Sequence, residues 1–206
     1  PYDKCPQKRV KQVVECLTEE INSNSDIIKQ IKQFSDFEVA LKQDKLSVLV
    51  GMEGLSYIGE DVDMLHYFYD VVGARHASLT WNEQNALATG VGGDPLRGLT
   101  DSGKNAVRKL EELKMIVDVS HANEKSFWDI MDIATKPVIA SHSNVKALSD
   151  HRRNLTDNQI KAIAESGGII GINGYRDFVD YKNWQRADVG DLVNHIDYMA
   201  DLVGID

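Results

Sequence analysis

Three residues with metal-binding side chains come directly after short apolar runs of the sequence. Glu53 follows VLVGM, His121 follows IVDVS, and His142 follows PVIAS. The carboxyl ends of the strands in an α/β barrel share one face, so these side chains can meet although 68 and 21 residues separate them. Two neutral imidazoles and one carboxylate are typical of hydrolytic zinc sites, in which the metal keeps an open position for water. An isolated Glu or His is more often structural, but three at matching places favour a metal site, for zinc or in its place manganese or cobalt.

A pair of arginines follows the last of these residues. Arg152 and Arg153 lie between His142 and a helix that is expected to begin near Thr156. Such a pair is usually a solvated surface feature. Beside a metal site, however, the planar guanidinium group offers two parallel donors to a substrate carboxylate.

The other histidines favour structural interpretations. His66 falls in an aromatic helical stretch, His195 falls in an amphipathic one, and His76 begins a strand on the face expected to point away from the metal site. The chain has no G-x-S-x-G motif, no P-loop motif and no G-x-G-x-x-G after a strand. Catalysis by a serine nucleophile and nucleotide binding by these routes are therefore not expected.

Alternating strands and helices must position these side chains. Short β-branched runs alternate with amphipathic stretches, and several runs are apolar on both faces, as a parallel sheet covered by helices requires. We expect helices over residues 8–34, 61–72, 100–114, 123–134, 156–166 and 189–203, and strands over 46–52, 74–80, 115–120, 137–141 and 168–173. Thr100 or Asp101 is the expected N-cap of its helix. Long loops over 81–99 and 174–188 follow strand ends, where functional loops of barrels lie.

The number of strands predicts an α/β fold of barrel or open-sheet type. A complete (β/α)8 barrel has eight units in about 250 residues. Five strands in 206 residues therefore predict one partial barrel domain over residues 1–206, truncated at both ends, with the first strand and the last strands missing.

The composition limits the partners that we expect. A formal net charge of −9 disfavours a nucleic-acid-binding surface and favours small molecules. No apolar run approaches 20 residues, so no transmembrane segment is expected in this chain. The only cysteines, Cys5 and Cys16, are too few for a disulfide scaffold, and their number fits a reduced cytoplasm.

Several segments resemble the membrane (renal) dipeptidase family of zinc metallopeptidases, most of all its bacterial branch. They run in the family's order and spacing through roughly residues 45–206: GMEG (51–54), RHASLTWNEQNALATG (75–90), RGLTDSGK (97–104), VDVSHANEKSF (117–127), PVIASHS (137–143) and HRRNLTDNQIKAIAESGGIIGIN (151–173). The resemblance implies a TIM-type (β/α)8 barrel with two zinc ions bridged by a glutamate. It also implies hydrolysis of dipeptides by a metal-activated hydroxide.

The resemblance implies a role for each matching residue. Glu53 corresponds to the catalytic bridging glutamate, and His121 and His142 correspond to the two histidines that hold one zinc. Arg153 corresponds to the arginine that receives the free carboxylate of the dipeptide, while Arg152 keeps its structural interpretation.

Two departures from the family pattern bear on activity. Trp81 stands where mammalian members have a histidine that polarises the scissile carbonyl, with Asn82 as a neighbouring candidate for that role. The family's His-x-Asp of the first strand, and the aspartate of a Ser-Asp-Phe-Asp-Gly segment that shuttles a proton, have no counterpart within these 206 residues. We therefore expect a dipeptidase whose 206-residue segment alone is inactive.

The expected partner is a small dipeptide, and a homodimer remains open. Two alternatives are kept. Another metal-dependent amidohydrolase on a related barrel would share Glu53 and His142 but would not need Arg153. A non-catalytic barrel relic that binds a small molecule would account for Trp81 and the missing ligands.

Overall fold

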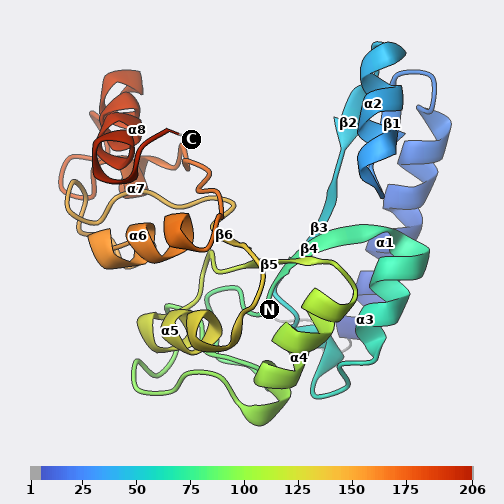
Figure 1. The fold of residues 1–206 in the computed structure, drawn as a ribbon, viewed down its shortest axis with the longest axis horizontal. Helices are drawn as coiled ribbons and strands as arrows, with labels where there is room; N and C mark the ends of the chain where they lie inside the picture. The colour runs from blue at the N-terminus through green and yellow to red at the C-terminus, as the bar shows by residue number, and fades with distance from the viewer. Residues whose placement is uncertain (1–5, 206) are drawn as a thin grey trace.

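Four parallel strands form the sheet that carries the predicted site residues (Figure 1). In spatial order they are β3 (Val50–Glu53), β4 (Ala74–Ser78), β5 (Ile116–Asp118) and β6 (Val138–Ile139). The computed structural model describes residues 6–205. Within that range the sheet is open, and the fold is α/β as the alternating pattern predicts. The predicted strand over 168–173 is reduced to one parallel bridge between Ala140 and Ile170, where the segment lies at the outer side of β6.

The register of the sheet brings the carboxyl ends of the strands level. Glu53 pairs with Ser78, Ser78 with Asp118, and Asp118 with Ile139, so these residues form one row across the sheet. The chain leaves β5 and β6 directly after this row. Its next turns carry the two histidines of interest toward the end of β3.

Helices follow each strand and cover the sheet. Between strands lie α3 (Met64–Tyr67) with a π-helical turn over Phe68–Val72, then α4 (Asp101–Glu112) and α5 (Glu124–Ile133). After β6 come α6 (Asp157–Glu165), α7 (Arg176–Val179) and α8 (Val189–Val203), which group together in the orange to red part of the chain in Figure 1. The short α7 lies inside the segment that was expected to be a loop.

Capping residues set where the central helices begin. Thr100 is the N-cap of α4, and its hydroxyl accepts a hydrogen bond from the Gly103 amide at 3.0 Å, which confirms the expected start. Thr156 and Gln159 form a reciprocal capping box at the start of α6. The start of α6 matters for the site because it ends the segment that carries Arg153.

The core lies between the sheet and its helices. Burying each large apolar side chain there contributes roughly 1.5–3 kcal/mol. The largest fully buried side chains include Leu55, Leu65, Phe68, Leu87, Leu110, Phe127, Ile130, Ile160 and Ile163.

The N-terminal region differs from the prediction of one helix over 8–34. Helix α1 (Pro6–Ser23) ends early, and β1 (Ile28–Gln30), α2 (Phe34–Lys42) and β2 (Leu46–Val48) follow, with β1 and β2 paired in parallel as a separate sheet. The run NSNSD at 22–26 explains the early end, because Asn, Ser and Asp favour turns over helix interiors. The predicted strand 46–52 is accordingly two strands that belong to different sheets.

Candidate metal centre

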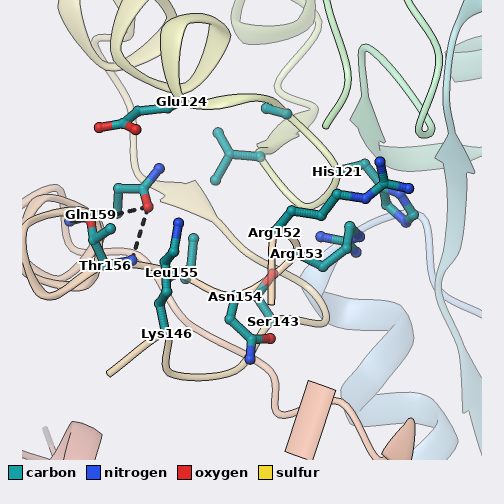
Figure 2. A pocket seen from close by; sticks show the side chains of 12 residues that line it. His121, Glu124, Ser143, Lys146, Arg152, Arg153, Asn154, Leu155, Thr156 and Gln159 are labelled. Carbon is teal, nitrogen blue, oxygen red and sulfur yellow. Dashed lines mark hydrogen bonds between the residues drawn. The ribbon is translucent and has the colours of Figure 1, made fainter. Parts of the chain in front are cut away.

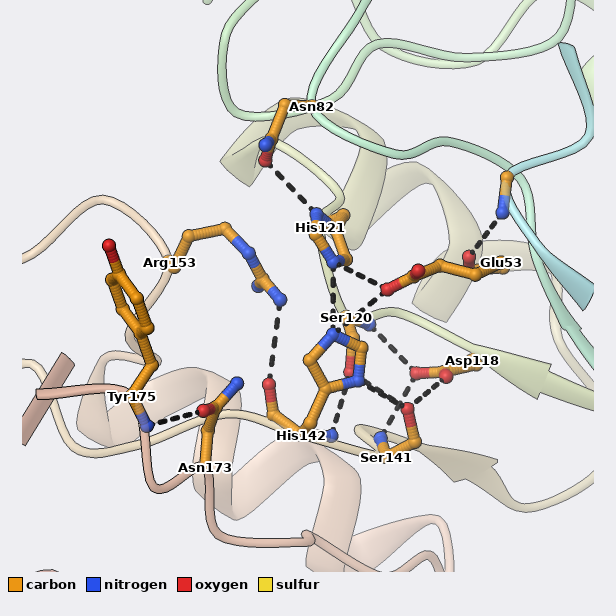
Figure 3. Close-up of polar contacts among 12 residues, drawn as sticks. Glu53, Asn82, Asp118, Ser120, His121, Ser141, His142, Arg153, Asn173 and Tyr175 are labelled. Atoms are coloured by element: carbon orange, nitrogen blue, oxygen red, sulfur yellow. Dashed lines mark hydrogen bonds and ion pairs between the residues drawn. The ribbon is translucent and has the colours of Figure 1, made fainter. Parts of the chain in front are cut away.

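Glu53, His121 and His142 meet at the carboxyl ends of β3, β5 and β6 (Figure 3). The His121 Nε2 atom lies 3.0 Å from Glu53 Oε1 and 2.9 Å from His142 Nε2, and His142 Nε2 lies 3.3 Å from Glu53 Oε1. The Glu53 side chain is 55% exposed, whereas that of His121 is 7% exposed. The cluster is therefore closed on the His121 side and open on the Glu53 side.

A hydrogen bond from a loop fixes the orientation of His121. Its Nδ1 atom lies 3.0 Å from the side-chain oxygen of Asn82, which can only accept. Nδ1 therefore carries the proton, and Nε2 presents its lone pair to the cluster. His121 has a φ of +77°, a left-handed conformation that costs roughly 1–2 kcal/mol in a residue with a side chain. The fold accepts this strain where the chain turns out of β5.

His142 is held from its other side by Ser141. The His142 Nδ1 atom lies 2.8 Å from Ser141 Oγ, and this hydroxyl donates in turn to the buried carboxylate of Asp118. The Nε2 atom of His142 therefore also faces the cluster with its lone pair. Two imidazole lone pairs and a carboxylate oxygen converge on one point.

The two histidines are neutral at physiological pH. Burial, followed by the positive charge of Arg153 and the neighbouring His142 ring, lowers the pKa of His121 to about 3. Burial and then the Arg153 charge also lower the pKa of His142, against the opposing effects of Asp118 and Glu53. Neutral imidazoles are the form that binds metal ions.

Arg153 is buried beside the cluster. Only 5% of the residue is exposed, and burial lowers the pKa of its guanidinium group to about 10, so it stays charged at neutral pH. The guanidinium lies over the ring of Phe178 at 5.5 Å, and Nη2 donates weakly to the His142 carbonyl oxygen at 3.5 Å. Its Nε atom has no hydrogen-bond partner among residues 6–205.

A small cavity of about 40 Å³ opens next to Arg153 and His121 (Figure 2). Its wall carries three cationic side chains, those of Lys146, Arg152 and Arg153, and the carboxylate of Glu124. The cavity therefore favours a small anionic group. Arg152 itself is exposed.

The prediction that His76 points away from the site was wrong. His76 lines a cavity of about 220 Å³ together with Glu53, Asp118, Ser141 and His142. Side chains alternate between the two faces of a strand, so His76 shares a face with Ser78, whose hydroxyl accepts from the Gly54 amide of β3.

Two of the remaining histidines, His66 and His195, have the structural surroundings that were expected of them. His195 is buried, accepting from the Val145 amide and donating to the Val179 carbonyl oxygen. His66 is half-exposed beside Asp70.

The position of Trp81 also bears on the departure from the family pattern. The residue is 44% exposed, and its ring centroid lies 5.9 Å from that of His121. The neighbouring Asn82 is engaged in orienting His121, as described above. This contact engages the side-chain oxygen of Asn82, whereas its NH₂ group is the donor that a substrate carbonyl would need.

Sequence reasoning missed Asp118, Ser141 and the orienting role of Asn82. One signal was present for Asp118, because a carboxylate interrupts the otherwise apolar strand MIVDVS. A charged residue inside a buried strand needs partners, and here they are the groups beside His142.

Comparisons with known proteins place the chain in a family. A family model described as membrane dipeptidase (peptidase family M19) matches residues 5–206. The chain belongs to this family. A protein of Acinetobacter calcoaceticus described as an uncharacterized protein in the PQQ-III 3' region is 33% identical over 210 residues, which cover 96% of this chain and 66% of that protein.

Two solved structures share the fold of this dipeptidase-family chain. A metallo peptidase from Rhodobacter sphaeroides, liganded with a phosphinate mimic of the dipeptide L-Ala-D-Ala, is 30% identical with a TM-score of 0.83, over 92% of this chain and 56% of that one. The dipeptidase AC, a metallo peptidase of family M19, is 29% identical with a TM-score of 0.88, over 96% and 61%. The chain thus spans about 60% of the length of these structures.

Proposed function

We propose that this chain carries the hydrolytic site of a zinc-dependent dipeptidase. The observation that supports a metal is that three acceptor atoms, His121 Nε2, His142 Nε2 and Glu53 Oε1, converge with separations of 2.9–3.3 Å. Hydrogen bonds at Nδ1 orient the two imidazole rings so that each Nε2 atom faces this point. Two ligand atoms on a tetrahedral zinc with bonds near 2.05 Å lie about 3.3 Å apart. The donor set of two imidazoles and a carboxylate also suits zinc in a hydrolytic site.

Glu53 is proposed to bridge two zinc ions. Its Oε1 atom faces His121 and His142, and the side chain is more than half exposed, which leaves the carboxylate accessible from outside the cluster. One zinc would be held by His121, His142 and Glu53. The other would share Glu53 and take its remaining ligands from sequence outside these 206 residues.

The chain's own residues would bind and orient the dipeptide. When bound, the metal supplies Lewis acidity that polarises the scissile carbonyl and lowers the pKa of a water molecule. Arg153 holds the free C-terminal carboxylate, because its buried cationic group lacks a full set of acceptors within residues 6–205 and faces an anion-favouring cavity. A longer peptide has no carboxylate at that distance from the scissile bond, so Arg153 selects dipeptides.

We also infer that the open sheet is part of a (β/α)8 barrel within one domain. The free edge of β3 and the bridge beyond β6 are the places where further parallel strands would pair. The solved relatives extend well past the matched region, which supports this interpretation. By the same argument, the 206-residue chain alone would hydrolyse dipeptides poorly.

Metal analysis and an activity panel on the full-length protein test the proposal. We expect about two zinc ions per protein and hydrolysis of at least one member of an L,L and L,D dipeptide panel, abolished by chelation. A full-length protein without tightly bound metal and without turnover would contradict it, and would favour a non-catalytic relic.

A pair of arginine variants tests the substrate class. Arg153→Ala is expected to raise KM strongly for dipeptides, whereas Arg108→Ala, at an exposed arginine of α4 that does not line this cavity, leaves KM near the wild-type value. C-terminally amidated dipeptides should be poor substrates for the wild-type protein. Unchanged turnover by Arg153→Ala would instead favour an amidohydrolase that acts on another substrate.

A further inference from the structure

A buried carboxylate lies behind the metal-facing histidine of β6. Asp118 ends β5 and is 4% exposed. Its Oδ1 atom accepts from the backbone amides of Ser120 at 2.9 Å and Ser141 at 3.1 Å, and its Oδ2 atom accepts from the Ser141 hydroxyl. A buried charge is costly unless it is fully hydrogen-bonded, and Asp118 meets that condition with groups next to the cluster.

The hydrogen bonds that connect Asp118, Ser141 and His142 can run in one direction only. An ionised carboxylate accepts and never donates, so the single hydroxyl proton of Ser141 goes to Asp118. The Ser141 oxygen must then accept from His142 Nδ1, 2.8 Å away. The remaining nitrogen, Nε2, is left with its lone pair directed at Glu53 and His121 (Figure 3).

We propose that Asp118 is a positioning residue which, through the hydroxyl of Ser141, fixes the tautomer and the ring orientation of His142 for metal binding. This inference rests on the proposed metal site. His121 is oriented differently, because the side-chain amide oxygen of Asn82, in a loop, accepts the hydrogen bond from its Nδ1–H group directly. The Ser120 hydroxyl adds to the effect by accepting from the His142 backbone amide at 3.1 Å.

Asp118→Asn is the sharpest test because it reverses the chain of hydrogen bonds. The two backbone amides that donate to Oδ1 require an oxygen there, so the new NH₂ group points at Ser141 and donates. Ser141 must then donate to His142 Nδ1, which moves the ring proton to Nε2 and blocks the metal-binding lone pair. Metal affinity is expected to fall about 10- to 100-fold, the usual range for an outer hydrogen-bond partner of a ligand.

Ser141 variants separate this role from simple packing. Ser141→Ala breaks the chain of hydrogen bonds and should weaken zinc binding within the same range, while Ser141→Thr keeps the hydroxyl and should restore it. Ser166→Ala is the matched control. The Ser166 hydroxyl accepts from the Val138 amide at the other end of β6, so its loss should leave zinc affinity unchanged.

Two readouts on the full-length protein decide the matter. Zinc affinity is measured by competition with a chelator, alongside urea unfolding of each metal-free variant. The ¹⁵N shifts of His142 in the metal-free protein report which ring nitrogen carries the proton at a fixed neutral pH. We expect Nδ1–H in the wild type and Nε2–H in Asp118→Asn.

The outcomes distinguish the two proposals. A wild-type protein that does not bind zinc but shows Nδ1–H at His142, changed to Nε2–H in Asp118→Asn, would contradict the proposed function and leave only the control of the His142 tautomer by Asp118 standing. The same His142 tautomer in wild type and Asp118→Asn, or equal zinc affinities, would overturn the positioning role. If Ser166→Ala also loses zinc affinity, in proportion to its loss of unfolding free energy, the positioning role would be overturned as well.

Discussion

At the scale of single residues, the site depends on which nitrogen of each histidine carries the proton. For His121 the deciding group is the Asn82 oxygen, 3.0 Å from Nδ1. Asn82→Ala removes that acceptor and frees the ring to adopt the other tautomer, so zinc affinity should fall about 10- to 100-fold. Asn82→Asp keeps an acceptor in place and should bind zinc far better than the alanine variant. Chelator competition measures both, and equal affinities for Ala and Asp would contradict the orienting role.

A second prediction concerns the contact between Gly51 and His76. A Cβ atom at position 51 would lie 1.9 Å from His76 Nε2, so Gly51→Ala must displace the ring. Overpacking of this kind typically costs about 1–3 kcal/mol in unfolding free energy. His76→Ala removes the obstacle, so the double variant should lose much less than the sum of the two single losses. Additive losses in urea unfolding would show that the ring does not occupy this space.

The residues of the site were partly predictable from their positions after apolar runs. Glu53, His121 and His142 could be predicted to meet, and the structure brings their ligand atoms within 4.8 Å. Their metal-binding roles and the substrate-binding role of Arg153 remain proposals. Asp118 and His76 could not be placed, because a one-residue change in strand register moves a side chain to the opposite face and the sequence does not fix that register.

At the scale of elements, α7 holds the guanidinium group of Arg153. The ring of Phe178 on α7 lies 5.5 Å below that group. Phe178→Ala removes a cation–π contact of roughly 0.5–1.4 kcal/mol, so KM for dipeptides should rise about 2- to 10-fold while kcat changes little. Phe178→Tyr should restore KM, and Trp184→Ala, an exposed aromatic residue in the same segment, should have no effect. A drop in kcat alone would argue against this positioning role.

The start of α2 gives a pH-dependent prediction. The backbone amides of Lys32 and then Gln33 donate to Asp36 and hold its pKa below the ordinary 3.8, against the opposing effect of burial. A carboxylate with a lowered pKa stabilises the fold above its unfolded pKa, and this contribution disappears as the pH falls through the folded pKa. Asp36→Asn should therefore cost roughly 0.5–1 kcal/mol at pH 7, and progressively less as the pH falls below the ordinary 3.8 through the lowered folded pKa.

The control for that prediction lies on the same helix. Glu38 is exposed on α2, and Glu38→Gln should leave the unfolding free energy nearly unchanged at both pH values. Urea unfolding curves of the three proteins provide the measurement. An Asp36→Asn loss that is the same at pH 7 and at pH 2.5 would mean that the carboxylate charge has no part in the capping.

Elements with strong local signals were predictable, and those decided by pairing were not. The start of α4 can be predicted from Thr100, because the hydrogen bond of its hydroxyl is made within the first turn of the helix and depends on no other element. The boundary between β2 and β3 has no local signal, because LSVLVGM reads as one apolar run. Only the partners, β1 for the first part and β4 for the second, divide it at Leu49.

At the scale of the whole molecule, no helix within residues 6–205 is both long and apolar enough to cross a membrane. The cluster of Glu53, His121 and His142 connects distant parts of the chain. It joins the ends of β3, β5 and β6, which lie 68 and 21 residues apart in the sequence. An ion bound there would add a further link among three segments that already belong to one sheet.

Metal binding should therefore stabilise the folded protein as a whole. A ligand that binds only the folded state adds about 2.7 kcal/mol at 100 times its Kd. We expect the Tm of the full-length protein to rise with zinc concentration and to fall on chelation. His142→Ala should abolish this dependence, because it removes a ligand atom, whereas His66→Ala, on an exposed side chain beside Asp70, should keep it. A Tm that is independent of zinc in the wild type, with both variants behaving alike, would mean that the three converging side chains do not hold a metal.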